Sequence, residues 1–379
     1  MKINISVAGK YHLFNLAQQL EKHGHLSQLI TSYPKFEVVK FGIPKDKVNS
    51  VLIKEIVERA WRKIPVLKHI YNQHLVHELF DKLAMRSLKP SDIFVGTSST
   101  SLHTLRAAKQ FGAVTIIERA SSHISFQDRN LEEEYNKCGI KIPAYQFDPR
   151  VTEKELCEYE EADYVFIPSS FVKKTYLDFG YPAEKLVQIP YGVELSQFKQ
   201  IPKEDNIFRV IFAGASRLIK GVHYLLQAFS ELDIPNSELL LIGSVNDEMK
   251  PFFKKYEGKF RCIGHIPQKD LYKHYSQGSV FVLNSIDDGF GYVIPQAMAC
   301  GLPVICTTNT GGPDVVREGK DGFIIPIRNV EALKNKLMYL FENPGICRQM
   351  GQSAKERVAE GFTWDDYGER MIAQYRLLL

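Results

Sequence analysis

The sequence predicts an α/β protein made of two Rossmann-like, doubly wound domains that face each other across a cleft. Its 379 residues suit two or three domains of ~100–200 residues each. In both halves, apolar β-branched runs alternate with apolar residues at helical spacing, which is typical of parallel sheets with right-handed crossovers. Residues 199–206 are polar, lack periodicity and are predicted to be an interdomain linker. Ligands of this architecture bind at the carboxyl ends of the strands.

We expect the first domain to cover residues 1–198 and the second to cover residues 207–362. Strands of the first domain are predicted at residues 2–8, 26–31, 92–96, 113–118, 164–167 and 186–189, with helical patterns at 14–20, 102–111, 151–161 and 171–178. Strands of the second domain are predicted at residues 208–213, 238–242, 260–263, 280–283, 303–306 and 323–325. The final segment, residues 364–379, has the pattern of one amphipathic helix.

Composition excludes several classes of protein. Hydrophobic residues make up 44% and charged residues 24% of the chain, which is ordinary for a globular protein and excludes disorder. No run of ~18 apolar residues occurs, so no membrane-spanning helix is expected. The apolar run at residues 1–9 is too short and interrupted for a signal peptide, so we expect a cytoplasmic protein. A net charge of +4 is too small to imply nucleic-acid binding by itself.

Neither disulfides nor a metal site are expected. No CxxC pair occurs, and a chain of this length needs no disulfide framework. We therefore predict buried free thiols at Cys138, Cys157, Cys262, Cys300, Cys306 and Cys347. His74, His77 and Glu78 lie together in a helical pattern, but no further metal ligand follows at a recognisable spacing.

Residues 35–90 form a basic segment. They hold 12 basic and 6 acidic residues, so their net charge of +6 exceeds that of the whole chain. Ile56, Ala60, Trp61 and Ile64 place apolar groups near one face of a predicted helix. Two interpretations stay open: a surface helix that touches anionic lipid or an anionic acceptor, or a solvated helix whose apolar stripe packs on the domain. We favour the second, because a basic amphipathic helix is only suggestive.

The most informative stretch is the loop that follows the predicted strand at residues 280–283. We expect Pro295 to be the first residue of the next helix and Gly301 to be the left-handed residue that ends it. Such a loop exposes backbone N–H groups at the positive end of a helix and places the Asp288 carboxylate beside them. This arrangement can hold a phosphate on the amides and a hydroxylated ring on the acid, with Gln296 pointing into the same cleft.

A second candidate element follows the predicted strand at residues 208–213. Arg217 and Lys220 lie three residues apart in a glycine-bounded loop. Arginine binds phosphate oxygens through two N–H groups, and lysine binds them as a point charge, so together they could neutralise a leaving diphosphate without a metal. Two cations that are merely exposed on a loop between a strand and a helix would give the same sequence pattern. The loop at residues 284–301 of the same domain favours the interpretation in which they bind phosphate.

These motifs resemble the retaining glycosyltransferases of family 4, which have the two-domain GT-B fold. The resemblance rests on Arg217 with Lys220-Gly221, on Asp288-Gly289-Phe290-Gly291 with Gln296-Ala297-Met298-Ala299-Cys300-Gly301, and on Gly311-Gly312. It covers about residues 208–330, and the tail from Phe362 resembles the family's last helix, which crosses back onto the first domain. The first half resembles the family only in its alternation of strands and helices and in a few loops.

The resemblance implies roles for the residues of the second domain. The family carries two Glu residues separated by seven others; the first binds hydroxyls of the donor hexose and the second binds the nucleotide ribose. Asp288 and Gln296 stand at these positions here. Asp288 is one methylene shorter, and Gln296 keeps an acceptor oxygen but loses the charge. Further donor-binding residues implied by the family are Gly289, Phe290, Gly291, Tyr292 and Val293.

The first domain is implied to contribute a catalytic histidine near the anomeric carbon. The family's histidine follows a mid-domain strand, and His123 follows the predicted strand at residues 113–118 in a polar turn. Gly9 comes after the first predicted strand, where a donor phosphate or sugar can approach the backbone. Lys10 and His12 are further candidates on the acceptor side.

The implied activity is transfer of a hexosyl unit, with retention of configuration, to a hydroxyl acceptor in cell-surface polysaccharide or glycolipid synthesis. The expected donor is a UDP-, GDP- or ADP-sugar, and the expected acceptor is a carbohydrate or a lipid-linked sugar. No Asp-X-Asp triplet occurs, so Arg217, Lys220 and loop amides, rather than a metal, are expected to stabilise the leaving diphosphate. No cofactor is expected, and peripheral contact with the inner face of the membrane through residues 35–90 stays open.

Two other functions stay open. The residues at positions 288 and 296 raise the possibility of a non-transferring relative, such as a nucleotide-sugar epimerase or a sugar-binding subunit of a larger assembly. A dinucleotide-dependent oxidoreductase would also use two Rossmann-like halves, but Gly9 stands alone after the first strand and no GxGxxG follows it. Donor binding without transfer to any acceptor would favour the first alternative.

Overall fold

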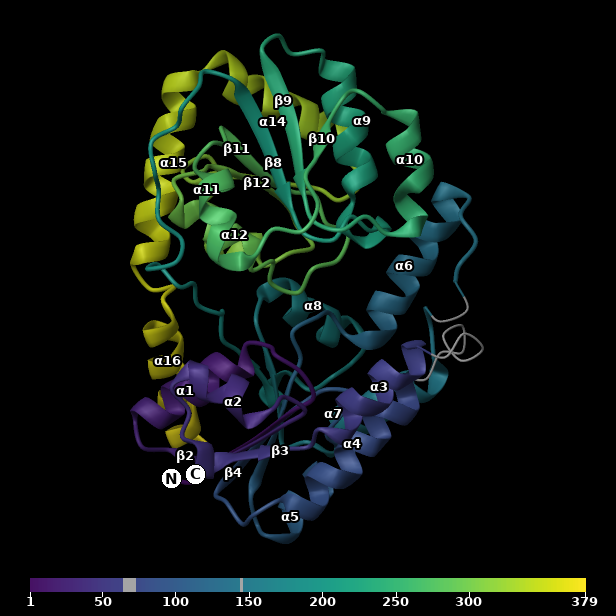
Figure 1. Ribbon diagram of the computed structural model, residues 1–379, viewed down its shortest axis with the longest axis vertical. Helices are drawn as coiled ribbons and strands as arrows, with labels where there is room; N and C mark the ends of the chain where they lie inside the picture. Colours follow the sequence, from purple (N-terminus) through teal and green to yellow (C-terminus); the bar gives the residue numbers. More distant parts are fainter. Residues whose placement is uncertain (64–72, 144–145) are drawn as a thin grey trace.

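The computed structural model describes residues 1–63, 73–143 and 146–379, without the side chains of residues 58–60, 62 and 63. Its strands form two parallel sheets in two bodies, one above the other in Figure 1. Both chain ends lie at the first body, because the last helix returns to it. Within the described residues, no helix is long and apolar enough to cross a membrane.

The first sheet has seven strands in the order β3-β2-β1-β4-β5-β6-β7. They are β1 (Ile3–Val7), β2 (Leu26–Thr31), β3 (Val48–Ser50), β4 (Ile93–Thr97), β5 (Val114–Glu118), β6 (Tyr164–Ile167) and β7 (Leu186–Gln188). The central strand β1 pairs in parallel with β2 and β4, with Ile5 opposite Leu29 and Val95. All five residues of β1 are buried, as expected where helices cover both faces of a parallel sheet.

The second sheet has six strands in the order β10-β9-β8-β11-β12-β13. They are β8 (Phe208–Ala213), β9 (Ser237–Ile242), β10 (Arg261–Cys262), β11 (Val280–Leu283), β12 (Val304–Thr307) and β13 (Gly322–Ile325). Every residue of β8, β11 and β12 is buried. Both sheets are parallel with crossover connections, so the fold class expected from the sequence, two facing Rossmann-like bodies, is confirmed.

Helices fill the connections between the strands. In the first half they are α1 (Leu13–Lys22), α2 (Lys35–Val38), α3 (Ile53–Lys63), α4 (Gln73–Ser87), α5 (Leu102–Gln110), α6 (Ile124–Cys138), α7 (Pro149–Glu161) and α8 (Ser170–Asp178). In the second half they are α9 (Val222–Leu232), α10 (Lys250–Lys255), α11 (Leu271–Tyr275), α12 (Val293–Ala299), α13 (Gly312–Val315), α14 (Val330–Glu342), α15 (Pro344–Ala359) and α16 (Trp364–Leu377).

The chain crosses between the two bodies at two adjacent points. Val193, after β7, forms an isolated parallel bridge with Thr363, which precedes α16. Between them the backbones come so close that a Cβ on Gly192 would lie 2.6 Å from the carbonyl oxygen of Thr363. Thr363 and Asp366 form a capping box that starts α16, and this helix then packs on α1 of the first body. The predicted return of the last helix is therefore confirmed.

The sequence predicted no element at residues 124–138, where the structure has the 15-residue helix α6, and it missed or overestimated short elements at the sheet edges. It predicted no strand at residues 48–50, where β3 forms a three-residue edge strand. The strand expected at residues 260–263 is reduced to two residues in β10, also at a sheet edge. The six cysteines are free, as predicted, but only Cys300, Cys306 and Cys347 are buried, whereas Cys138 and Cys157 are partly buried and Cys262 is exposed. Short edge strands carry little apolar pattern, because only one side of them is paired.

Candidate active site

Two cations lie in the loop between β8 and α9, at the carboxyl edge of the second sheet. The loop ends at Gly221, which has a φ of +62°, and a Cβ there would lie 1.9 Å from the carbonyl oxygen of Asn284. Glycine therefore allows this loop to approach the loop after β11. The Arg217 side chain is partly exposed, and its Nε lies 4.0 Å from Glu248 Oε1. This Nε has no hydrogen-bond partner among the described residues, so Arg217 keeps an unused donor near the site.

Lys220 and Asp288 form an ion pair that joins the two loops. Lys220 Nζ lies 2.6 Å from Asp288 Oδ2, and Asp288 Oδ1 accepts a hydrogen bond from the Gly291 N–H at 3.0 Å. The two side chains are 26% and 19% exposed, so the pair is largely but not fully shielded from solvent. The structure thus brings together two residues that the sequence assigned to phosphate and sugar, and it pairs them with each other.

Helix α12 begins at Val293, so Pro295 is its third residue. The expectation that Pro295 is the first helical residue is wrong by two positions. Proline is tolerated there because the first turn of a helix has N–H groups without an intrahelical partner. Gln296 lies one turn into this helix and is 9% exposed. Gly301 takes a left-handed φ of +80° just after the helix, as predicted.

Phe290 and Tyr292, both expected to contact the donor, pack among aromatic side chains between the two halves, Phe290 buried and Tyr292 partly buried. Tyr292 stacks on Tyr191 with ring centroids 5.0 Å apart and planes at 8°, and Phe290 meets the same ring edge-on at 5.2 Å. Burial raises the pKa of Tyr292 well above its ordinary value, so its hydroxyl stays neutral. These side chains hold the loop at residues 288–293 against the segment after β7 that carries Tyr191.

The first acid of this loop contacts the first body. Ser122 Oγ donates a hydrogen bond to Asp287 Oδ2 at 2.5 Å, across the boundary between the halves. Asp287 is 2% exposed, and burial raises the pKa of its carboxyl to about 7. The backbones meet here too, because a Cβ on Gly289 would lie 1.9 Å from the carbonyl oxygen of Ala120. The sequence did not predict this contact between the halves. The only feature that pointed to a second functional acid was the pair of adjacent aspartates at residues 287 and 288.

The loop after β1 brings Gly9 and Lys10 to the carboxyl edge of the first sheet. A Cβ on Gly9 would lie 2.6 Å from the ring of Tyr11, so glycine leaves room for that side chain. Lys10 is exposed, and its Nζ lies 4.7 Å from the centroid of the Phe41 ring. Such a cation–π contact leaves the ammonium available to an anionic ligand.

His12 lies in a buried polar cluster rather than on the surface. Its Nε2 is 3.2 Å from Glu118 Oε2 and 3.2 Å from the Tyr191 hydroxyl. The other Glu118 oxygen is buried and has no hydrogen-bond partner among the described residues. The sequence analysis singled out His12 alone and missed Glu118 and Tyr191, although both lie at carboxyl-edge positions of the first sheet.

His123 lies at the start of α6 with its ring packed inside the first body. Its Nδ1 accepts a hydrogen bond from the Ser125 N–H at 3.3 Å, and the ring stacks on Phe179 at 4.6 Å with planes at 9°. Tyr159 and Tyr176 pack against the same ring. Burial, and then the charge of Arg119, lowers the pKa of His123 to about 4, so the imidazole is neutral at pH 7. These contacts give the ring a capping and packing role in this conformation.

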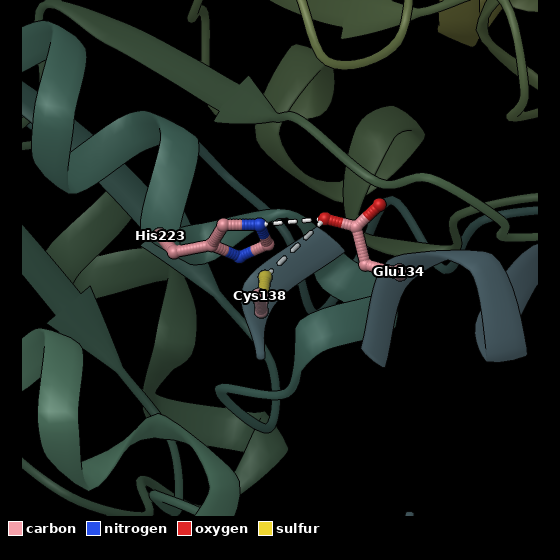
Figure 2. A group of neighbouring side chains, drawn as sticks. All are labelled: Glu134, Cys138 and His223. Atoms are coloured by element: carbon pink, nitrogen blue, oxygen red, sulfur yellow. Dashed lines mark hydrogen bonds and ion pairs between the residues drawn. The ribbon is translucent and has the colours of Figure 1, made fainter. Parts of the chain in front are cut away.

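Helix α6 reaches across to the second body through Glu134. Glu134 Oε1 accepts hydrogen bonds from His223 Nε2 and the Tyr224 hydroxyl, both at 2.8 Å, and lies 3.8 Å from the Cys138 thiol (Figure 2). Its Oε2 accepts a hydrogen bond from Arg328 Nε at 2.6 Å. Through these contacts Glu134 of the first body binds His223 and Arg328 of the second, and the guanidinium supplies the positive charge opposite the carboxylate.

The helix residues considered for a metal have other neighbours. Glu78 forms ion pairs with Lys154 at 2.5 Å and with His103 at 2.9 Å. Its carboxylate is therefore neutralised by side chains, which keeps its pKa at about 2 against the opposing effect of burial. Burial lowers the pKa of His77 to about 4. His74 and His77 each have a buried Nδ1 without a hydrogen-bond partner among the described residues.

Comparisons with known proteins agree with this architecture. The sequence model of a family described as "Glycosyl transferases group 1" matches residues 194–357. The O-antigen chain mannosyltransferase B of Escherichia coli is 26% identical over 60% of this chain and 65% of its own length. The capsular polysaccharide biosynthesis glycosyltransferase CapM of Staphylococcus aureus is 30% identical over 46% of this chain and 47% of its own length. The chain therefore spans less than two thirds of the length of these curated relatives.

Solved structures share the fold over the whole chain. Sucrose-phosphate synthase from Thermosynechococcus elongatus has a TM-score of 0.75 at 20% identity and covers 100% of this chain and 99% of its own. HepE of Anabaena, solved with UDP and glucose, has a TM-score of 0.73 at 16% identity and covers 100% of both chains. The chain thus has the fold of these proteins, and its residues 194–357 are similar to the family of glycosyl transferases group 1.

Proposed function

We propose that the protein is a retaining, metal-independent hexosyltransferase. It would move a hexosyl unit from a nucleotide-diphosphate sugar to a hydroxyl acceptor in polysaccharide or glycolipid synthesis. The family match over residues 194–357 supports glycosyl transfer. Two relatives are described as glycosyltransferases of O-antigen and capsular polysaccharide, and a third acts on phosphatidylinositol monomannoside with GDP-mannose. The structural neighbour HepE was solved with UDP and glucose and with UDP-glucose.

The observation that carries this proposal is the ion pair between Lys220 and Asp288, which joins the loops after the neighbouring strands β8 and β11. Arg217 lies in the same loop as Lys220, three residues before it. The cations would bind the diphosphate, and each charge-assisted hydrogen bond contributes ~1.5–3 kcal/mol. Asp288 would bind hexose hydroxyls. Lys220 and Asp288 would exchange their mutual ion pair for these contacts when the donor binds.

The proposed reaction needs no group on the protein as nucleophile. The acceptor oxygen bonds to the anomeric carbon on the face from which the diphosphate oxygen leaves, and the acceptor proton passes to that departing oxygen. Arg217 and Lys220 stabilise the charge that develops on the diphosphate as the bond breaks. Because these two side chains supply positive charge, the step requires no bridging metal ion. Contact between the two bodies would exclude water and limit hydrolysis.

The two halves would divide the substrates. Residues 207–362 would bind the donor, with Gly289, Gly291 and Val293 offering backbone groups and Gln296 accepting from the ribose. Residues 1–198, with the helix at 364–379, would bind the acceptor. Gly9 would lie near the donor phosphate. His123 stays a prediction for the anomeric carbon, and it requires the ring to leave its stack on Phe179.

A donor assay tests the proposal. UDP-glucose and GDP-mannose are offered separately, binding is followed by calorimetry, and release of the nucleotide diphosphate is followed by a coupled assay. We expect one donor to bind and to be consumed when a hydroxyl acceptor is added, with and without a metal chelator. Asp288→Ala should lower consumption at least tenfold while the melting temperature stays near that of the wild type. Binding without consumption would favour a non-transferring relative.

A further inference from the structure

Large apolar side chains are exposed along one edge of the first body. Phe36 in α2 is 68% exposed, and Val39, which follows α2, is 44% exposed. Leu52, Ile53 and Ile56, at the start of α3, are 40%, 48% and 62% exposed. Single exposed apolar residues are ordinary on protein surfaces, but a group of five on neighbouring segments is typical of a contact surface.

The two segments lie at the same edge of the first sheet. β2 and β3 run parallel with Thr31 opposite Ser50, so the segments that follow them leave the sheet together. The Val51 N–H donates to the Thr31 carbonyl at 2.7 Å, and Ser32 Oγ donates to Glu55 Oε1 at 2.8 Å. These bonds tie the beginning of the α2 segment to the first turn of α3. Figure 1 shows α2 and α3 on the first body, in purple and blue-violet.

The first turn of α3 carries two exposed isoleucines. Ile53 and Ile56 are three residues apart, so they share one face of the helix, and both are exposed. The interpretation preferred from the sequence, in which this stripe packs inward, is therefore wrong for Ile56. Trp61 is partly buried, whereas the Ala60 side chain and Ile64 lie outside the described residues. An amphipathic helix with an exposed apolar face is suited to an external partner.

Basic residues outnumber acidic ones in the described part of this edge. Residues 35–57 hold five lysines and three acidic residues, a net charge of +2, and Lys40 forms an exposed ion pair with Glu37 at 2.7 Å. Lys40 and Lys45 are exposed, and Lys40 Nζ lies 6.0 Å from the Phe36 ring centroid. Exposed aliphatic and aromatic groups among lysines match an anionic bilayer, where apolar groups enter the boundary of headgroups and acyl chains and lysines meet phosphates.

We propose that this edge, formed by Phe36, Val39, Leu52, Ile53 and Ile56, docks on the surface of an anionic lipid bilayer. Val7, at the end of β1, lies opposite Thr31 of β2, so the loop that carries Gly9 leaves the sheet at the same edge. A lipid-linked acceptor held in the bilayer would therefore enter close to the proposed donor site. This last step rests on the proposed function, whereas the docking itself does not.

Vesicle sedimentation tests the docking. The full chain is mixed with vesicles of phosphatidylcholine alone or with about 30% phosphatidylglycerol, at low and high salt. We expect sedimentation with the anionic vesicles only, weakened by salt as the lysine attraction is screened. The double variant I53S/I56S should lower the partition coefficient at least tenfold, because two isoleucines no longer enter the bilayer.

Leu177→Ser is the matched control, since Leu177 is an exposed leucine (43%) on α8 of the same body. It should bind vesicles as the wild type does. Unchanged melting temperatures show that all variants are folded. Equal binding of I53S/I56S and wild type, or no binding of wild type to anionic vesicles at low salt, would overturn the docking. Donor binding is measured without vesicles, so a chain that binds UDP-glucose or GDP-mannose but no vesicles overturns the docking alone. A chain that binds anionic vesicles but neither donor overturns the proposed function alone.

Discussion

Lys220 and Asp288 lie 68 residues apart in the chain and form an ion pair with Nζ 2.6 Å from Oδ2. The pair connects the loop after β8 to the loop after β11. Each partner is less than one third exposed, so the pair competes directly with any ligand that needs one of them. This relationship gives the donor site a property that neither residue has alone, because the lysine is free for phosphate only when the aspartate is engaged elsewhere.

The ion pair predicts opposite effects of two substitutions on the affinity for UDP, which has a diphosphate but no hexose. Asp288→Asn should raise the affinity about two- to fivefold, because it releases Lys220 from a partly exposed ion pair. Lys220→Ala should lower the affinity at least tenfold, because a charge-assisted contact is lost. Titration calorimetry measures both. Lys174→Ala, which removes an exposed ion pair with Asp178 on α8, is the control. Weaker UDP binding by Asp288→Asn contradicts the prediction.

Gly289→Ala should separate the two bodies. A Cβ at this position would lie 1.9 Å from the carbonyl oxygen of Ala120. The two backbones would therefore have to move apart, and the contact between Gly289 and Ala120 would be lost. We expect a loss of about 1–3 kcal/mol in the free energy of unfolding, together with lower donor turnover. Gly345→Ala is the control, because no atom lies within 4 Å of its Cβ position. Equal melting temperatures of the two variants would show that the Gly289 contact is dispensable.

Glu134→Ala should weaken the contact of α6 with the second body. The substitution leaves Arg328, which is 15% exposed, without its buried carboxylate partner at 2.6 Å. Removing one partner of a buried pair costs about 3–5 kcal/mol. The neighbouring Glu133 is 52% exposed and lies 3.4 Å from Arg328 Nη1, so Glu133→Ala should cost only about 0–1 kcal/mol. Denaturant unfolding gives the free energies, and hydrogen exchange should show faster exchange in α6 and α9 of the Glu134 variant alone.

Asp287 predicts a pH dependence of stability. Burial raises its pKa from an ordinary 3.8 to about 7, so the folded protein keeps a proton that the unfolded chain releases above pH ~4. The resulting contribution to the free energy of unfolding is complete below pH ~4 and is lost as the pH rises through 7. Asp287→Asn cannot lose a proton, so its melting temperature relative to wild type should rise between pH 4 and pH 8. Parallel curves for the two proteins would refute the assignment.

Much of the fold was predictable because the information is local. Largely apolar runs such as residues 208–213 and 280–283 indicated buried parallel strands, and the structure has β8 and β11 there. Edge elements were not predictable, because a three-residue strand such as β3 has too few residues to show a pattern. The apolar residues of α3 had the right spacing, but spacing does not say whether a stripe packs inward or stays exposed.

The candidate site also has a part that the sequence predicts and a part that it does not. Asp288, Gln296 and Gly301 belong to one continuous stretch, and Arg217 and Lys220 to another, so the spacing of polar residues and glycines was enough to single them out. The contacts between the bodies were missed, because their partners are far apart: Ser122 and Asp287 by 165 residues, and Arg328 and Glu134 by 194.

The sequence alone determined the two doubly wound sheets, the order of their elements and the short motifs that carry charge in the second half. These features follow from hydrophobic periodicity and from the backbone needs of glycine and proline, which act over a few residues. Only the tertiary structure decided that Lys220 faces Asp288, that Asp287 binds Ser122 and that the ring of His123 lies among aromatic side chains. Such partners depend on how two bodies meet, because burial and charge at a contact come from residues that the local sequence does not contain.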